Sequence, residues 1–183
     1  MIETDRLILR RWRDADRDPY AAMMADPDVG SWLGGTETRA QTDARIDLRE
    51  VELATTGWGP LAMERKADGA FLGCAGLSPV EAPLPLATSI EIGWRLARDA
   101  WGAGYASEAA RALLDDGFNR RGLAEIVAFT AESNLRSQAV MNRLGMTRDP
   151  ARDFEHPRLA RDHPLRRHIV YFARPISEPS ARS

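Results

Sequence analysis

The chain has 183 residues, 44% of them hydrophobic, and a formal net charge of −2 at pH 7. A chain of this length can bury a substantial core without disulfides or metals, and its balanced charge argues against a broad basic surface for nucleic acid. The single cysteine, Cys74, cannot form an intramolecular disulfide and fits a reducing cytoplasm. No stretch approaches the ~20 apolar residues that span a bilayer, so we expect no membrane segment.

The first part of the chain predicts one strand and two helices. Residues 6–12 alternate apolar and polar side chains, as a half-buried strand does. The pattern becomes helical over residues 14–25 and stops at Asp26-Pro27, because a residue before proline avoids helical backbone angles. A second helix is expected over about residues 36–55, closed by Gly57.

Three extended runs come next, at residues 58–65, 70–77 and 89–97. A turn at residues 67–69 joins the first two runs, so we expect them to form a hairpin. The third run leads into a loop with two glycines and then into a helix over residues 105–119, whose apolar positions form one stripe rich in alanine. Small side chains on that stripe would let the helix approach a sheet closely.

The rest of the chain predicts a strand, a helix and a final strand. Residues 123–130 are almost continuously apolar, which is typical of a strand covered on both faces. A short helix over residues 135–144 ends at Gly145, and residues 168–173 form the last strand. The predicted fold class is therefore α/β, with a mixed sheet and helices on both faces.

The segment over residues 89–119 is the candidate binding site. It joins a strand, a loop with Gly102 and Gly104, and a helix. Glycines let the backbone approach a ligand, the first N–H groups of a helix have no intrahelical partner, and the helix dipole favours negative charge at that end. A pyrophosphate suits such a site. The alternative is a structural turn in which the glycines only supply positive φ angles.

Two runs around this loop carry a resemblance to a known family. They are Ile90-Glu91-Ile92-Gly93-Trp94-Arg95-Leu96 and Trp101-Gly102-Ala103-Gly104-Tyr105-Ala106-Ser107-Glu108-Ala109. Together they resemble the cofactor motif of GNAT superfamily N-acetyltransferases, in the branch like the RimJ and RimL ribosomal-protein acetyltransferases. The wider superfamily usually opens this loop with Arg or Gln, whereas the RimJ/RimL-like branch commonly has Trp, as at Trp101. Gly104 and Ala106 match the two small positions of the motif.

Other segments resemble the same family in the same order, namely residues 4–12, 26–29, 58–59, 71–77 and 132–146. The resemblance implies a GNAT-like mixed, mostly antiparallel sheet with a splayed central strand pair. It also implies acetyl-CoA as co-substrate, with no metal. The pyrophosphate would then lie against Trp101, Gly102, Ala103, Gly104, Tyr105 and Ala106.

The resemblance also implies roles along the rest of the cofactor. If the strand with Trp94 and Leu96 splays from its neighbour, its backbone can hydrogen-bond the pantetheine amides as another strand would. A backbone N–H nearby can donate to the thioester oxygen. Asn134 is expected to cap the following helix, to bond the pantetheine arm, or both. Ser137 resembles the residue that protonates the leaving thiolate in RimL-like enzymes.

Glu91 is the candidate general base, because an attacking amine must be neutral and a base helps at pH 7. Strand alternation puts Glu91 on the same face as Gly93 and Arg95. Arg95 lies roughly 13 Å further along the strand, too far for a direct contact that would explain the acid. The carboxylate should therefore face a wet cleft or have a raised pKa. The alternative is a solvated strand face.

The acceptor is expected to be a primary amine, either a protein or peptide N-terminus or a small molecule. Loops over residues 29–38 and 79–88 would carry its specificity. Trp12, Trp32 and Trp58 are expected in the core, with Trp32, beside two glycines, as the candidate exception near the acceptor. The histidines are expected to be structural or surface residues, with His156 as the one candidate for the acceptor site. The three histidines have no metal-ligand spacing. We expect a cytoplasmic monomer or homodimer with no nucleic-acid or membrane partner.

Two other classes of protein share some of these features. A dinucleotide-binding oxidoreductase also has glycines between a strand and a helix, but Ser107 replaces its third glycine and only one parallel crossover follows. A catalytically silent CoA-binding module remains the alternative on the same fold, because a fold does not determine a function. In either case we expect one domain over residues 1–174 and a flexible C-terminal tail over residues 175–183.

Overall fold

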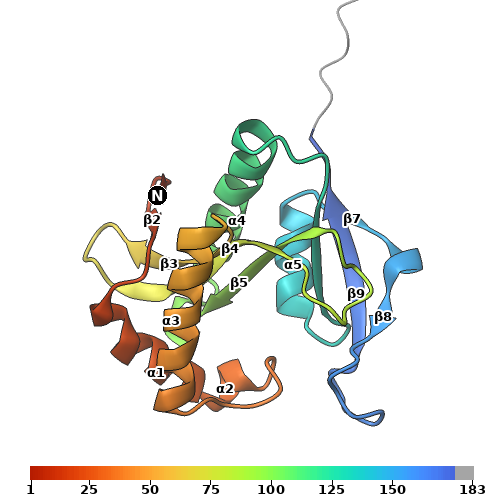
Figure 1. Cartoon of the computed structure of the whole chain (residues 1–183), viewed down its shortest axis with the longest axis horizontal. Helices are drawn as coiled ribbons and strands as arrows, with labels where there is room; N and C mark the ends of the chain where they lie inside the picture. Colours follow the sequence, from red (N-terminus) through yellow and green to blue (C-terminus); the bar gives the residue numbers. More distant parts are fainter. Residues whose placement is uncertain (176–183) are drawn as a thin grey trace, which may run out of the picture.

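The computed structural model describes residues 1–175, which contain a mixed sheet of nine strands in the order β1-β2-β3-β4-β5-β6-β9-β7, with β8 paired to β9 (Figure 1). The strands are β1 (Ile2–Glu3), β2 (Leu7–Arg10), β3 (Gly59–Arg65), β4 (Phe71–Pro79), β5 (Ile90–Leu96), β6 (Ile126–Ala131), β7 (Thr147–Arg148), β8 (Phe154–Glu155) and β9 (Arg167–Ala173). Apart from Pro175, the predicted tail lies outside the described residues.

Helices lie on both faces of this sheet, as predicted. On one face α1 and α3 pack against β4 and β3, and on the other α4 packs against β4 and β5 (Figure 1). The helical segments are η1 (Asp14–Asp16), α1 (Arg17–Ala25), α2 (Pro27–Gly30), α3 (Arg39–Thr55), η2 (Arg98–Ala100), α4 (Tyr105–Asp115), the π-helical turn η3 (Asp116–Arg120), α5 (Leu135–Arg143) and η4 (Pro150–Arg152). Among residues 1–175, none of these helices combines the length and the apolar character that crossing a membrane requires.

The face under α4 holds the larger part of the core. Ala109 and Ala110 are fully buried, and their small side chains let α4 approach the sheet closely, as the alanine stripe predicts. Leu113 packs in the same cluster as Ile92 and Leu96 of β5. A second cluster lies under α1 and α3 and includes Trp12, Tyr20, Met23, Met24, Val29, Ile46, Ala62 and Cys74.

The central strands β5 and β6 separate from each other. Among the strands of residues 1–175, this pair is parallel and the other pairs are antiparallel. A single residue pair, Glu91 with Val127, joins β5 to β6. Both residues lie near the start of their strands, so the strands diverge toward their carboxyl ends. The splayed central pair that the resemblance implies is therefore present.

The longer predicted elements are confirmed, whereas the shortest ones were missed. α3 begins after Thr38, which forms a capping box with Gln41, rather than at residue 36. The helix predicted over residues 14–25 is a 3-10 turn followed by α1. Strands β1, β7 and β8 have 2 residues each, too few for a period-two pattern to show in the sequence.

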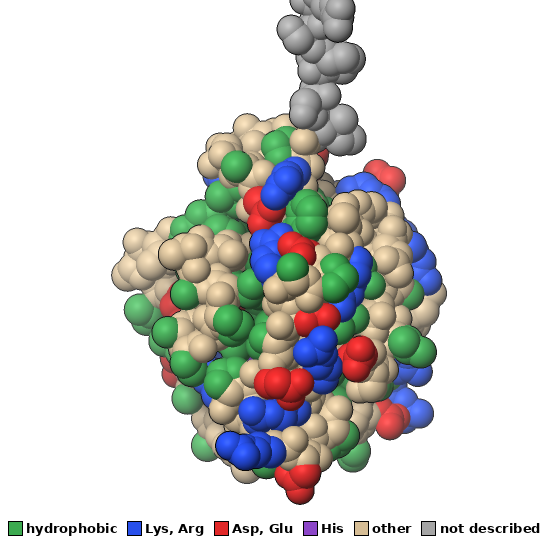
Figure 2. Space-filling model, turned by 90° about the vertical axis from the view of Figure 1, so that its right-hand side faces the viewer, with side chains coloured by type: hydrophobic (Ala, Val, Ile, Leu, Met, Phe, Trp, Pro, Cys, Tyr) green, Lys and Arg blue, Asp and Glu red, His purple; other side chains and the backbone are tan. Residues whose placement is uncertain are grey.

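Charges of both signs alternate on the face beside β8 and β9 (Figure 2). Arg152 and Arg174 both pair with Glu125, and Arg148 pairs with Asp153. On this face, charged side chains of opposite sign are thus paired with each other. This face carries no patch of a single sign among residues 1–175.

Gly73 of β4 is expected to be essential for the close approach of β4 to β5. Its φ angle is 137°, and a Cβ there would lie 2.1 Å from the carbonyl oxygen of Arg95. Gly73→Ala should therefore lower the free energy of unfolding by about 2 kcal/mol or more, measured by urea denaturation. Gly69→Ala is the matched control, because Gly69 has a φ of 72° but a Cβ there would meet nothing within 4 Å. Equal losses in the two variants would contradict the steric explanation.

Candidate active site

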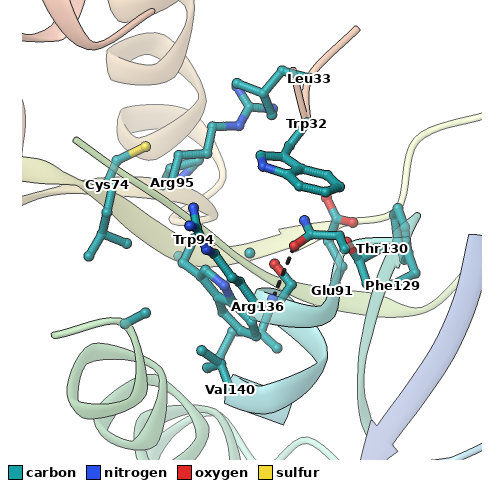
Figure 3. A pocket seen from close by; sticks show the side chains of 18 of the residues that line it. Trp32, Leu33, Cys74, Glu91, Trp94, Arg95, Phe129, Thr130, Arg136 and Val140 are labelled. Atoms are coloured by element: carbon teal, nitrogen blue, oxygen red, sulfur yellow. Dashed lines mark hydrogen bonds between the residues drawn. The ribbon is translucent and has the colours of Figure 1, made fainter. Parts of the chain in front are cut away.

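A cleft of about 1370 Å³ opens where β5 and β6 separate (Figure 3). It reaches from the start of α4 on one side of the sheet to α3 and the loop after α2 on the other. Segments that are far apart in the sequence therefore surround one cavity. The residues predicted to bind a cofactor or to act in catalysis all line it: Glu91, Trp94, Leu96, Trp101, Gly102, Ala103, Gly104, Tyr105, Ala106, Asn134 and Ser137.

The backbone of β5 presents two residues to the gap. The N–H of Ala97 donates to the carbonyl of Leu72 in β4 at 2.9 Å. Alternation along the strand therefore directs the backbone groups of Trp94 and Leu96 away from β4 and toward β6. The Leu96 carbonyl accepts a hydrogen bond from the Trp101 indole N–H at 2.9 Å. The cleft is thus bordered by a strand edge where β6 has moved away.

The loop before α4 leaves backbone donors free for an anion. Gly102 and Gly104 have φ angles of 78° and 83°, which residues with a Cβ rarely adopt. A Cβ at Gly102 would project into open space, with no atom within 4 Å. Gly104 is the N-cap of α4, and no side chain of residues 1–175 caps it. The N–H groups of the first turn, from Tyr105 onward, and the helix dipole therefore fit a diphosphate.

Arg6, which sequence reasoning did not select as a site residue, holds this loop in place. Its guanidinium donates to the Ala103 carbonyl at 3.0 Å and to Glu108 at 2.7 Å, and its Cζ lies 4.6 Å from the centre of the Tyr105 ring. The Thr4 hydroxyl also donates to Glu108, at 2.6 Å. The N-terminal segment is therefore tied to the first turn of α4 by an ion pair and a hydrogen bond to the loop backbone.

Further arginines lie on the rim of the cleft. Arg136 of α5 stacks on Trp101, with its Cζ 4.4 Å from the ring centre. Arg111 and Arg143 also line the cleft. Sequence reasoning missed all three, because nearly all basic residues of the chain are arginine and no pattern separates a binding arginine from a solvated one. The available signal was the place of Arg136 inside the family-like segment 132–146.

Asn134 begins α5 as its N-cap. Its side-chain oxygen accepts a hydrogen bond from the Ser137 backbone N–H at 3.2 Å, which confirms the predicted cap. The amide NH₂ of Asn134 remains available to a ligand. The Ser137 hydroxyl is half-buried, lines the cleft and has no hydrogen-bond partner in the described part of the chain. Both side chains can therefore serve a molecule bound between β5 and α5.

Glu91 is half-buried in the cleft (Figure 3) and forms no ion pair with residues 1–175. Burial raises the pKa of its carboxyl from the ordinary 4.5 to about 7, and the positive charges of Arg95 and Arg49 only partly oppose this shift. A substantial fraction of Glu91 is therefore protonated at neutral pH, and the ionised fraction is basic enough to accept a proton. The cleft position and the raised pKa agree with the sequence-based hypothesis.

Aromatic side chains line the α3 side of the cleft. Trp32 lies over the cavity near Glu91 and Phe129 (Figure 3). The rings of His156 and His168 also line the cleft, with their centres 5.0 Å apart. Trp32 and His156 therefore both line the cleft. This wall can enclose an uncharged or aromatic part of a substrate.

Comparison with known proteins identifies the class to which this fold and site belong. Residues 6–147 match the acetyltransferase (GNAT) domain family. The protein YkkB of Bacillus subtilis (strain 168) is 35% identical over 146 residues, which cover 79% of this chain and 84% of YkkB. The chain therefore belongs to the GNAT acetyltransferase family and is an acyltransferase. The dinucleotide-binding alternative is excluded by this membership.

Solved structures share the fold over almost the whole chain. The acetyltransferase from Agrobacterium tumefaciens str. C58 is 30% identical, with a TM-score of 0.75 over 95% of this chain and 94% of that one. RimJ of Mycobacterium smegmatis, solved in complex with CoA-disulfide, has a TM-score of 0.73 at 22% identity. The match covers 92% of this chain and 81% of the RimJ chain. GNAT acetyltransferases use acetyl-CoA.

The raised pKa of Glu91 predicts how stability depends on pH. Because the folded-state pKa is about 7 and the ordinary value is 4.5, the folded protein loses stability as pH rises between these values. Glu91→Gln cannot ionise, so it should melt at a higher temperature than the unchanged protein at pH 8. The difference should shrink toward zero as pH falls to 4.5. Thermal melts at both pH values, with the exposed Glu132→Gln as control, measure this; a pH-independent difference would contradict a buried carboxyl of high pKa.

Proposed function

We propose that this protein transfers an acetyl group from acetyl-CoA to a primary amine, by direct attack of the amine on the thioester in a ternary complex. The observation that carries the proposal is the continuity of the cleft. It joins the uncapped N-terminus of α4 to Glu91 through the split between β5 and β6. One cavity is therefore able to hold the phosphates of a CoA thioester at one end and an amine beside a carboxylate at the other.

The α4 side of the cleft suits acetyl-CoA from its phosphates to its thioester. Arg111, Arg136 and Arg143 add positive charge on the rim beside the proposed diphosphate site. The pantetheine amides fit the strand edge at Trp94 and Leu96, and the Asn134 amide adds a donor from α5. The proposed diphosphate site consists of Trp101, Gly102, Ala103, Gly104, Tyr105 and Ala106.

The remaining groups suit the chemistry of acetyl transfer. The amine nitrogen attacks the thioester carbonyl carbon, whose oxygen becomes an oxyanion, and a backbone N–H near Trp94 is the proposed donor to it. The Glu91 carboxylate accepts a proton from the amine. The Ser137 hydroxyl donates a proton to the CoA thiolate as the C–S bond breaks, and regains one from solvent. The products are an amide and CoA, with no covalent enzyme intermediate.

The proposed acceptor is either a protein or peptide N-terminus or a small-molecule amine. The loops over residues 29–38 and 79–88 border the α3 side of the cleft, where they are able to select among amines. We assign the activity to a single domain over residues 1–174, acting in the cytoplasm as a monomer or homodimer.

Calorimetric titration with CoA tests the proposed diphosphate site. Gly104→Val places a branched side chain at a φ of 83°, where backbone would meet phosphate, so the dissociation constant for CoA should rise at least about tenfold. Gly122→Val is the matched control, because Gly122 has a φ of 68° and open space around it but lies outside the cleft. If both variants fold and bind CoA as tightly as the unchanged protein, the loop is not the phosphate site.

Turnover tests the role of Glu91, with release of the CoA thiol as the readout. Since the carboxylate is the active form, the rate should rise with pH through a midpoint near 7. Glu91→Gln should lower kcat by about 10²-fold and remove this rising limb, whereas the exposed Glu132→Gln should leave both unchanged. A limb that persists in Glu91→Gln would assign the base to another group.

The same assay separates the enzyme from the catalytically silent module. The enzyme should release thiol only when an acceptor amine is present. Tight CoA binding without acceptor-dependent thiol release, across a broad panel of amines and peptides, would support the silent module instead.

A further inference from the structure

The floor of the cleft on the α3 side has small residues at its centre. Gly76 of β4 lies opposite Gly93 of β5, and a Cβ on Gly93 would meet no atom within 4 Å. The residues two positions before and after Gly93 on the same strand face are Glu91 and Arg95, and both line the cleft. An open trough therefore runs along β5 from the Glu91 carboxyl to the Arg95 guanidinium, with free space above Gly93.

Arg95 enters this trough without a partner of its own. It is half-buried, and it forms no ion pair or side-chain hydrogen bond with residues 1–175. Its side chain extends from β5 toward the loop that carries Trp32 and Leu33 (Figure 3). Glu91 does not pair with it, because the two residues start roughly 13 Å apart along the strand. The guanidinium therefore offers several unused donors to a molecule in the trough.

The other charges on this side of the cleft do not neutralise Arg95. The remaining arginines lie beside acids: Arg45 with Glu37, Arg49 with Glu52 at 3.5 Å, and Arg158 with Glu81 at 3.7 Å. Burial raises the pKa of the Cys74 thiol in this wall, and the charges of Arg95, Arg49 and Arg45 lower it. Three guanidiniums thus act on the same region. If the ionised form of Glu91 serves the amine, the charge of Arg95 is left for another group of the substrate.

From this arrangement we infer that the acceptor is a small amine that also carries an anionic group, a carboxylate or a phosphate. Arg95 binds the anionic group while the amine lies above Gly93 beside Glu91. The inference rests on the proposed acetyl transfer and specifies its substrate class. A guanidinium matches a carboxylate or a phosphate through two parallel hydrogen bonds.

The same geometry disfavours acceptors that carry a second positive charge. A diamine or polyamine whose first amine lies beside Glu91 would direct its next ammonium along the trough toward Arg95. Like charges at that distance repel, and the half-buried wall screens them less than bulk water does. Selection of the acceptor therefore involves both attraction of an anion and repulsion of a cation.

Matched pairs of amines test this inference. We use β-alanine with β-alaninamide, phenylalanine with phenylalaninamide, and phosphoethanolamine with ethanolamine, each at saturating acetyl-CoA. Only one member of each pair carries the anionic group. The first two pairs test a carboxylate, and the third tests a phosphate. We expect kcat/KM, measured by CoA thiol release, to be at least about tenfold higher for the anionic member of at least one pair.

Variants of Arg95 link this preference to the guanidinium. Arg95→Gln should abolish the preference by raising KM at least about tenfold for the anionic amine while kcat changes little, and Arg95→Lys should retain part of it. Arg161→Gln is the control, because Arg161 is exposed and lies outside the cleft. It should change neither the preference nor the affinity for CoA.

Equal kcat/KM within every pair, or a preference that survives in Arg95→Gln, would overturn the inference and leave the proposed acetyl transfer intact. If no amine of the panel releases thiol, calorimetry on the CoA-loaded protein decides. Binding of an anionic amine that is lost in Arg95→Gln supports the inference, and failure of every anionic amine to bind overturns it. Failure of CoA itself to bind would instead overturn the proposed function.

Discussion

The single residue pair between β5 and β6 is the constraint on which the rest of the site depends. Beyond Glu91 and Val127 the two strands diverge, and their facing backbone groups need a partner other than each other. Both strands also lead from the gap into helices, β5 into α4 through the glycine loop and β6 into α5 through Asn134. The gap, the uncapped helix end and the facing helix therefore lie together around one local departure from regular pairing. Ligands of open sheets bind at the carboxyl ends of such diverging strands.

Because the cleft passes through the sheet, its two sides can hold different chemistry. The α4 side offers backbone N–H groups and the arginines Arg111, Arg136 and Arg143, which suit phosphates. The α3 side offers Glu91 and Trp32 on a floor of small residues. A large anionic cofactor and a small amine would then enter from opposite sides and meet at the split. This separation keeps the cofactor phosphates away from the carboxyl that must receive a proton.

The fold and the geometry of the loop before α4 could be predicted from the sequence, because both depend on local patterns. Long periodic segments gave the main strands and helices, and Gly102 and Gly104 marked the loop through their conformational requirement. Arg6 and Arg136 escaped prediction because each acts through a contact with a residue far away in the chain. The unpaired state of Arg95 escaped it for the same kind of reason, since a missing ion partner is visible only when every neighbour has been placed.

The separation of the two sides of the cleft depends on the alternation of side chains along β5. Ile92 and Leu96 of β5 pack into the core with α4, whereas Glu91, Gly93 and Arg95 face the cleft. A shift of β5 by one residue against β4 would bury a carboxylate and a guanidinium under α4 and move apolar side chains into the cleft. Burying unpaired charge costs more free energy than a folded domain of this size can spare. The charged residues proposed to bind the acceptor therefore also disfavour the wrong pairing of the central strands, and Gly93 can remain small because the space above it is open cleft.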